Sequence, residues 1–355
     1  MVCPASPDLP PSNPNRTIRY WSLLQWLMLL ASGGLLATLV VWPTIGLHGF
    51  WDVLIPAAPA LVVVAPGIWR NICPLGTMSQ LARRTGWSRA RVVSTRVQPR
   101  LGLIGVALLL TLVPLRHPWF NQSGLATAAL LVTAAVAAVA MGVWLGGKSG
   151  WCAGLCPVHA VERLYGIRPV ITMTSAHCRQ CDACVAPCPD TTPDQRHGIG
   201  VKTPARSLAS ALMIGGFPGF VWGWFQVPDG VSAWAVGTWA WPFGGLVVTL
   251  AMYLLVAWRA GAAAQRTIAA VFGAAAVSCY YWFRLPALIG FGPYPGDGML
   301  VQAQGVISPV AVSVMQGGVT LFFFWWMVFR RPAPRAWMRR PQPASQATAV
   351  TIGMS

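Results

Sequence analysis

The chain has 355 residues, of which 55% are hydrophobic and only 9% charged, and its formal net charge is +17. Ordinary soluble domains carry about a quarter charged residues, so this composition excludes a soluble globular protein. The basic excess does not indicate nucleic-acid binding, because the cations separate apolar segments instead of gathering on one solvated domain. We therefore predict an all-α polytopic membrane protein.

Eight segments are apolar enough to cross a bilayer, which takes about 20 residues of helix. They are residues 21–43, 50–69, 101–116, 125–146, 207–227, 236–258, 267–290 and 308–329. The first is too long for the apolar region of a signal peptide and lacks an evident cleavage site, so we interpret it as an uncleaved anchor. Residues 1–20 and 331–355 are predicted to be cytoplasmic tails, and disorder is expected in 1–20 and after residue 340. Between them we distinguish a four-helix membrane half, a polar segment and a second four-helix half, at 21–146, 147–206 and 207–330.

The distribution of basic residues predicts the orientation. All of the 25 lysines and arginines except Arg116 and Arg284 lie in the two tails or in alternate connections between spans. Because cytoplasmic connections carry the excess of Lys and Arg, both termini and segment 147–206 are predicted to be cytoplasmic, in a bacterial inner membrane. Asp52, Asp229 and Asp297 then lie toward the opposite face.

One short stretch carries four cysteines. Residues 177–189 read HCRQCDACVAPCP, which places Cys178, Cys181, Cys184 and Cys188 in the order C-x2-C-x2-C-x3-C followed by proline. This spacing suits a 4Fe-4S cluster. A structural zinc site usually splits its ligands into two distant pairs, and a disulfide framework is typical of small secreted chains. We predict that the run binds a 4Fe-4S cluster.

Two similar motifs follow the second and fourth spans. They read GIWRNICPLGTMSQL at 67–81 and SGWCAGLCPVHAVERL at 149–164, so the first four spans are predicted to be two copies of one hairpin. The second motif contains Cys152 and Cys156 as C-x3-C-P, whereas the first contains Cys73 but has Trp69 at the leading position. A thiolate at the membrane border is costly unless a metal neutralises it, which makes these three cysteines candidate ligands. The alternative is that Cys-Pro only ends a helix and the thiols fill space.

Ligand counting leaves two arrangements open. If the run binds one cluster by itself, Cys73, Cys152 and Cys156 remain as three thiolates for a site that needs four. If Cys188 instead completes a second cluster with those three, the first cluster needs another ligand, which Cys3, water or a partner could provide. Ligation by His159 or His177, which would raise the potential as in Rieske centres, is a lesser alternative.

The paired border motifs and the cysteine run together resemble the NapH/NosR/CcoG class of membrane-bound ferredoxin-like electron-transfer proteins. The match covers roughly residues 50 to 190. It implies iron-sulfur clusters on the cytoplasmic side of a helical membrane domain, serving electron supply to a respiratory enzyme or maturation of a metalloenzyme. The chain departs from the class by having one run where members commonly have two, no leading cysteine in its first border motif, and four further spans.

The opposite face carries a second set of candidate residues. A quinol site or a docking surface is one interpretation, while snorkelling and interfacial aromatic anchoring explain the same side chains more simply. The residues are His48, Asp52, Arg116, His117, Tyr280, Tyr281 and Arg284. None of the five histidines lies in the middle of a predicted span, so a bis-histidine haem between helices is not expected.

We therefore predict an iron-sulfur protein that passes single electrons between a quinol or cytoplasmic donor and a partner redox enzyme. It is expected to be a subunit of an oxidoreductase system with no catalytic residues of its own, and to have one secure cluster and a candidate second. The alternatives are an assembly factor that reduces a metal or cofactor for a partner metalloenzyme, and a transporter whose cluster is structural or regulatory. The few intramembrane charges disfavour the transporter.

Overall fold

The computed structural model describes residues 14–89, 91, 93–94, 96–145, 148, 150–169, 197–198 and 203–330. These residues are helical, with no β-strand among them and one isolated bridge between Arg91 and Leu145. Helix α1 (Pro14–Val41) begins inside the tail that was expected to be disordered, so that prediction is wrong for residues 14–20. The fixed φ of proline suits the first turn of a helix, which explains a start at Pro14.

Seven helices in the described part of the chain are long and apolar enough to cross a membrane. They span Arg19–Val41, Pro43–Val64, Val97–Arg116, Gly124–Trp144, Val236–Gly261, Ala264–Leu288 and Pro309–Phe329, and they match seven of the eight predicted segments. Large apolar side chains such as Leu30 and Leu321 are more than 70% exposed on these helices. Such a surface is stable against lipid and not against water, so the chain is a polytopic helical membrane protein.

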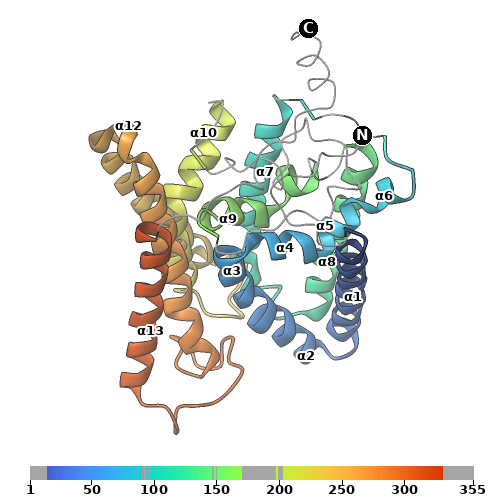
Figure 1. Ribbon diagram of the computed structural model, residues 1–355. Coiled ribbons are helices and arrows are strands. Elements are labelled where there is room, and N and C mark those ends of the chain that lie inside the picture. Colours follow the sequence, from blue (N-terminus) through green and yellow to red (C-terminus); the bar gives the residue numbers. More distant parts are fainter. Residues whose placement is uncertain are drawn as a thin grey trace.

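The second and fourth of these spans are each followed by short helices, most of which begin at proline. These helices lie close together midway up the view of Figure 1, and we call the region that they form, residues 66–84 and 150–165, the cysteine end (Figure 1). The elements are α2 (Pro43–Leu47), η1 (His48–Leu54), α3 (Ile55–Val64), α4 (Pro66–Ile72), α5 (Pro74–Ser79), α6 (Leu81–Arg84), α7 (Val97–Leu112), η2 (Pro114–Arg116), α8 (Gly124–Trp144), η3 (Trp151–Leu155) and α9 (Pro157–Tyr165).

The two hairpins exchange contacts reciprocally. Helix α5 of the first copy lies against α8 of the second, and α9 of the second copy lies against α3 of the first. Gly142 makes the first approach close, because a Cβ there would stand 2.0 Å from the carbonyl oxygen of Ser79. Gly166 does the same less tightly, with its Cβ position 3.5 Å from the carbonyl oxygen of Val62. Each copy therefore completes the packing of the other.

The predicted span 207–227 is helical but is not among the seven candidate spans. It forms α10 (Pro204–Ala211), η4 (Leu212–Gly216) and α11 (Phe217–Trp224), and nearly all of α11 is buried inside the protein. Glycines lower its hydropathy and bring it into backbone contact with the next helix, as they do in close helix pairs within membranes. A Cβ on Gly219 would stand 2.0 Å from the carbonyl oxygen of Gly245.

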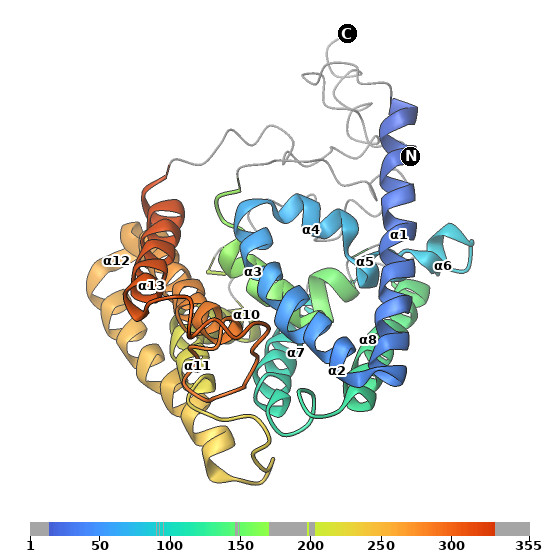
Figure 2. The ribbon, with the colours of Figure 1, turned by 90° about the horizontal axis from the view of Figure 1, so that it is seen from below.

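The last three spans stand together along one side of the molecule (Figures 1 and 2). Helix α12 (Val236–Leu288) is two antiparallel spans joined at Gly261, whose φ of 67° with ψ of −179° is accessible almost only to glycine. The rings of Tyr253 and Phe272 meet across this reversal at 5.4 Å. Helix α13 (Pro309–Phe324) and η5 (Trp325–Phe329) complete the chain that the structure describes. The buried core, with Val63, Leu164 and Phe220, draws on both halves.

Candidate functional site

Cys73 and Cys156 occupy the same local structure in the two repeats. Each is the residue before a helix that starts with proline, and their φ and ψ angles are −58° and 118° for Cys73 and −63° and 118° for Cys156. The backbone N–H groups of Leu75 and Gly76 act to lower the pKa of Cys73, and those of Val158 and His159 do the same for Cys156, although neither cysteine side chain forms a capping hydrogen bond. Nearby N–H groups favour a thiolate, and they would form hydrogen bonds that tune an iron-sulfur centre if they closed on the sulfur.

Burial acts against the thiolate in the protein without a metal. It raises the pKa of the Cys73 thiol and raises that of Cys156 to about 12, where a charge on Cys73 adds to the effect. Cys156 therefore lies within electrostatic reach of Cys73. Metal binding would reverse this preference, because ligation deprotonates a thiol outright.

Cys152 joins them from η3. A Cβ built on Gly76 would stand 3.7 Å from the Cβ of Cys73 and 3.8 Å from the Sγ of Cys152. The hydroxyl of Ser79 lies 3.9 Å from the same Sγ. The structure thus places Cys73 and Cys152 on either side of the start of α5, although they are far apart in the sequence, and Cys156 lies within electrostatic reach of Cys73.

A buried polar chain connects the two repeats beside these thiols. Arg70 on α4 donates from Nε to Glu162 on α9, and Glu162 also accepts from His159, whose Nδ1 lies 3.1 Å from Oε2. Burial opposes the charge on Glu162, but Arg70 and His159 outweigh it and lower its pKa. The Nζ of Lys148 donates to the carbonyl oxygen of Arg70 at 3.1 Å. The segment before Cys73 is thereby fixed to the helix that follows Cys156.

The donor set can be compared with what a metal needs. Within the described residues, no group of three or more His, Cys, Asp or Glu side chains is placed to hold one metal ion. Thiolates around a single zinc ion stand about 3.8 Å apart, given Zn–S bonds of about 2.3 Å in a tetrahedron. In a 4Fe-4S cluster each thiolate binds a different iron, so its ligands stand further apart. Side chains that do not converge on one ion can therefore still hold a cluster.

The cysteine run itself lies outside the described residues. This applies to Cys178, Cys181, Cys184 and Cys188, and also to His177 and Cys3. Its two flanks are described and both lie at α9. The preceding Tyr165 and Ile167 are buried there, and His197 beyond the run lies 2.8 Å, through Nε2, from the carbonyl oxygen of Ala160.

The opposite end of the molecule holds a network of buried ionic groups. Asp52 in η1 forms an ion pair with Arg284 in α12, lies 3.7 Å from Arg116 in η2, and is 2.6 Å from Nδ1 of His48. The guanidinium of Arg116 also lies over the ring of Trp51 at 4.5 Å. Three separate parts of the sequence therefore share one buried carboxylate.

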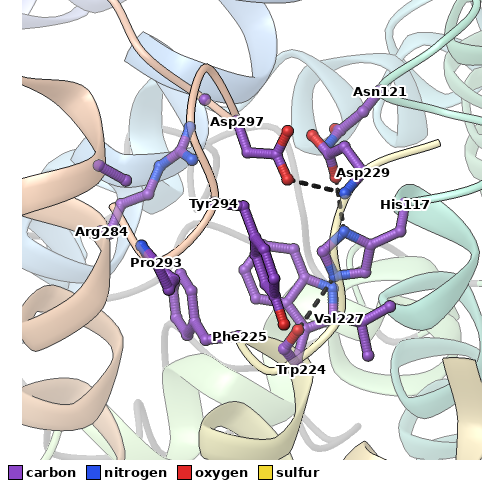
Figure 3. Close-up of a pocket in the computed structure, with 12 residues that line it drawn as sticks. His117, Asn121, Trp224, Phe225, Val227, Asp229, Arg284, Pro293, Tyr294 and Asp297 are labelled. Atoms are coloured by element: carbon purple, nitrogen blue, oxygen red, sulfur yellow. Dashed lines mark hydrogen bonds and ion pairs between the residues drawn. The ribbon is translucent and has the colours of Figure 1, made fainter. Parts of the chain in front are cut away.

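A second carboxylate lies beside this network in a small cavity (Figure 3). Nδ1 of His117 is 2.5 Å from Asp229, its Nε2 is 3.1 Å from the carbonyl oxygen of Trp224, and Asn121 donates to Asp229 at 2.7 Å. Both ring nitrogens face acceptors, so both donate when the ring is protonated. Burial acts to raise the pKa of Asp229, but the interactions with His117, Arg116 and Asn121 outweigh it. The pKa of Asp229 is therefore lower than its ordinary value.

The cavity is small. Its volume is about 30 Å³, which has room for about two water molecules. A quinol ring would need the cavity to open. The lining includes Tyr294, Asp297 and Arg284, and Asp297 accepts from the backbone N–H of Asp229 at 2.8 Å.

Most of the ionic residues at this end can be identified from the sequence, but which residue pairs with which cannot. Asn121 carried no signal, because a single amide in a polar turn is unremarkable. Glu162 at the cysteine end could have been found, since it lies three residues after His159 on a helix and is one of only eight acidic residues.

Comparison with protein-family models, with curated proteins and with solved structures gave no match for this chain.

Proposed function

We propose that this chain is a membrane-bound iron-sulfur protein that passes single electrons between a quinol or cytoplasmic donor and a partner redox enzyme. The observation that carries this proposal is the position of Cys73, Cys152 and Cys156, which two sequence repeats place at the same end of the helices. Structural filler would not need the same backbone conformation at Cys73 and Cys156, with N–H groups of the next turn near each sulfur.

The flanks of the cysteine run support the same proposal. The chain leaves α9 near Ile167 and returns to it at His197, and Cys156 stands at the start of that helix. A ferredoxin-like loop anchored in this way begins one length of α9 away from Cys156 and ends at Ala160, one turn after that cysteine. In this proposal Cys178, Cys181, Cys184 and Cys188 bind one 4Fe-4S cluster, and the border cysteines contribute to a second.

The bound clusters would take up and release single electrons with little rearrangement. The protein supplies the rest. It partly buries the three cysteines and places backbone N–H groups near the sulfurs of Cys73 and Cys156. The matched pair of Arg70 and Glu162 keeps the two repeats, and with them the thiols, at a fixed separation.

The charge distribution supports a cytoplasmic position for the cysteine end, in a bacterial inner membrane. Arginines such as Arg70, Arg84 and Arg163 lie at this end, whereas Asp52 and Asp229 lie at the other. Short connections rich in Lys and Arg remain on the cytoplasmic side. A cytoplasmic run would meet the reducing conditions that keep thiols free for iron.

Anaerobic purification with iron and sulfide determination tests the proposal, together with EPR of the dithionite-reduced protein. We expect about eight irons per chain in the wild type and about four in Cys181→Ser and in Cys152→Ser. The matched control is Cys279→Ser, since Cys279 lies within α12 away from these groups. Iron-free protein, or equal iron in all four proteins, would refute the proposal.

A second experiment separates electron transfer from a role in assembling another enzyme. An electron carrier is reduced or reoxidised by a quinol or soluble donor at catalytic rates in purified form. An assembly factor leaves its purified partner fully active, and its deletion removes the partner's cofactor in cells.

A further inference from the structure

His159 carries a buried ring nitrogen with an unused lone pair. The side chain is 7% exposed, its Nδ1 faces Glu162, and its Nε2 has no hydrogen-bond partner in the described part of the chain. Burial lowers the pKa of this histidine, which favours the neutral ring. With the proton on Nδ1 facing the carboxylate, Nε2 is an acceptor left without a donor, which is costly in a buried place.

This arrangement is characteristic of histidines that bind metals. A ligating histidine almost always donates its other ring N–H to a carboxylate or carbonyl group, which fixes the tautomer and the ring orientation. Glu162 provides that carboxylate, and Arg70 keeps it ionised and in place. The helix also carries Cys156 at its start, one turn before His159.

The repeat relates His159 to the place where a cysteine is missing. Cys73 and Cys156 are equivalent, so the same offset of 83 residues relates Trp69 to Cys152 and Gly76 to His159. In the structure Gly76 faces Cys152, with its Cβ position 3.8 Å from the sulfur. Because α5 lies against η3 of the second copy and α9 lies against α3 of the first, the equivalent direction from His159 leads into the first copy, where position 69 follows α3. The pair of Arg70 and Glu162 confirms that α4 and α9 approach each other there.

We propose that Nε2 of His159 is the fourth ligand of the border 4Fe-4S cluster, with Cys73, Cys152 and Cys156, in place of the cysteine absent at position 69. The inference rests on the proposed function. It also settles the ligand count, because Cys188 then stays with the other cysteines of the run and neither cluster needs Cys3. One neutral ligand among three thiolates raises the midpoint potential of the border cluster above that of an all-cysteine cluster.

The test uses full-length protein labelled with ¹⁵N-histidine, and pulsed EPR of the reduced clusters. We expect a ¹⁵N coupling in the wild type and in Cys181→Ser, where the run no longer contributes. His159→Gln should lose the coupling and hold about four irons per chain instead of about eight. The four remaining irons would show that this variant is folded.

Two further variants control the assignment. His197 is also buried with one unpartnered ring nitrogen among the described residues, so His197→Gln should keep both the coupling and the iron. Adding Trp69→Cys to His159→Gln supplies the missing thiol and should restore about eight irons without nitrogen coupling and at a lower midpoint potential.

Each contrary result has a distinct meaning. Eight irons without a nitrogen coupling, or a coupling lost only in His197→Gln, would overturn the role of His159 and leave the proposed function standing. Four irons in the wild type would remove the border cluster, and His159 with it, while the run cluster remains. Absence of iron and sulfide would refute the proposed function itself.

Discussion

Arg70 and Glu162 form a buried ion pair between α4 and α9, 92 residues apart in the sequence. The pair joins the residue three positions before Cys73 to the helix that starts after Cys156. Its geometry fixes how the two border motifs meet.

Removing one member should therefore destabilise the protein. We expect Glu162→Gln to lower the free energy of unfolding by about 3 kcal/mol, because it leaves the guanidinium of Arg70 buried without its counter-ion. Thermal unfolding in detergent, followed by helical circular dichroism, measures the change. The double variant Arg70→Met with Glu162→Met is the control and should be much closer to the wild type. Equal losses in the single and double variants would show that packing and not charge is responsible.

The network around Asp52 should behave similarly at the other end. Asp52→Asn removes the carboxylate that Arg284 and Arg116 share, and we expect a loss of about 3 kcal/mol. His48→Gln is the matched control, because the side chain of His48 is 45% exposed and its pairing with Asp52 is worth little in water. An Asp52→Asn variant as stable as the control would contradict the structure.

Asp229 makes stability depend on pH. Its folded pKa lies below the ordinary value of 3.8, so it stabilises the folded state above that pH, and the contribution is lost as the pH falls through the folded pKa. We expect Asp229→Asn to melt below the wild type at pH 7 and the difference to shrink below about pH 4. Tryptophan fluorescence melting curves from pH 3 to 7 measure this, because the chain has 19 tryptophans. A constant difference across this range would exclude the pairing with His117.

Two neighbouring glycines provide a sharp test of the contact between α11 and α12. A Cβ on Gly245 would stand 2.1 Å from the carbonyl oxygen of Gly219, whereas Gly244 has no atom within 4 Å of its Cβ position. We expect Gly245→Ala to cost at least about 2 kcal/mol, since the helices must separate. Gly244→Ala should be neutral or stabilise by up to about 1 kcal/mol through helix propensity. Matching effects would mean that the helices are not in backbone contact.

The sequence predicted the spans well for a physical reason. A helix that crosses a bilayer needs about 20 consecutive apolar residues. Such a stretch can be recognised in the sequence without knowing which helices pack against it. Span 207–227 is the exception because it is buried by protein: glycines such as Gly219 replace large apolar residues where backbones touch. The role of those glycines depends on residues 20 or more positions away, which hydropathy does not report.

The candidate site was partly readable. The spacing of Cys152 and Cys156 and their likeness to the motif around Cys73 identified the border thiols, because ligand spacing is local. The sequence does not predict the two ion pairs, Arg70 with Glu162 and Asp52 with Arg284. Ion pairs between distant segments depend on how the helices pack. The position of each histidine relative to its acceptors likewise needs coordinates.

The reciprocal packing of the two hairpins has a consequence for biogenesis. Helix α5 lies against α8. Residues 88 and 89 lie at the end of α8, where the N–H of Arg89 donates to the carbonyl oxygen of Val143 at 2.7 Å. The first hairpin therefore enters the membrane before the surface that receives its final helix has been synthesised. Cys73 is synthesised before Cys152 and Cys156. The three border cysteines can therefore take their final positions only after the fourth span has been inserted. Ribosome-bound chains shorter than about half the protein lack the second border motif, so the iron insertion that we propose would come late in the protein's maturation.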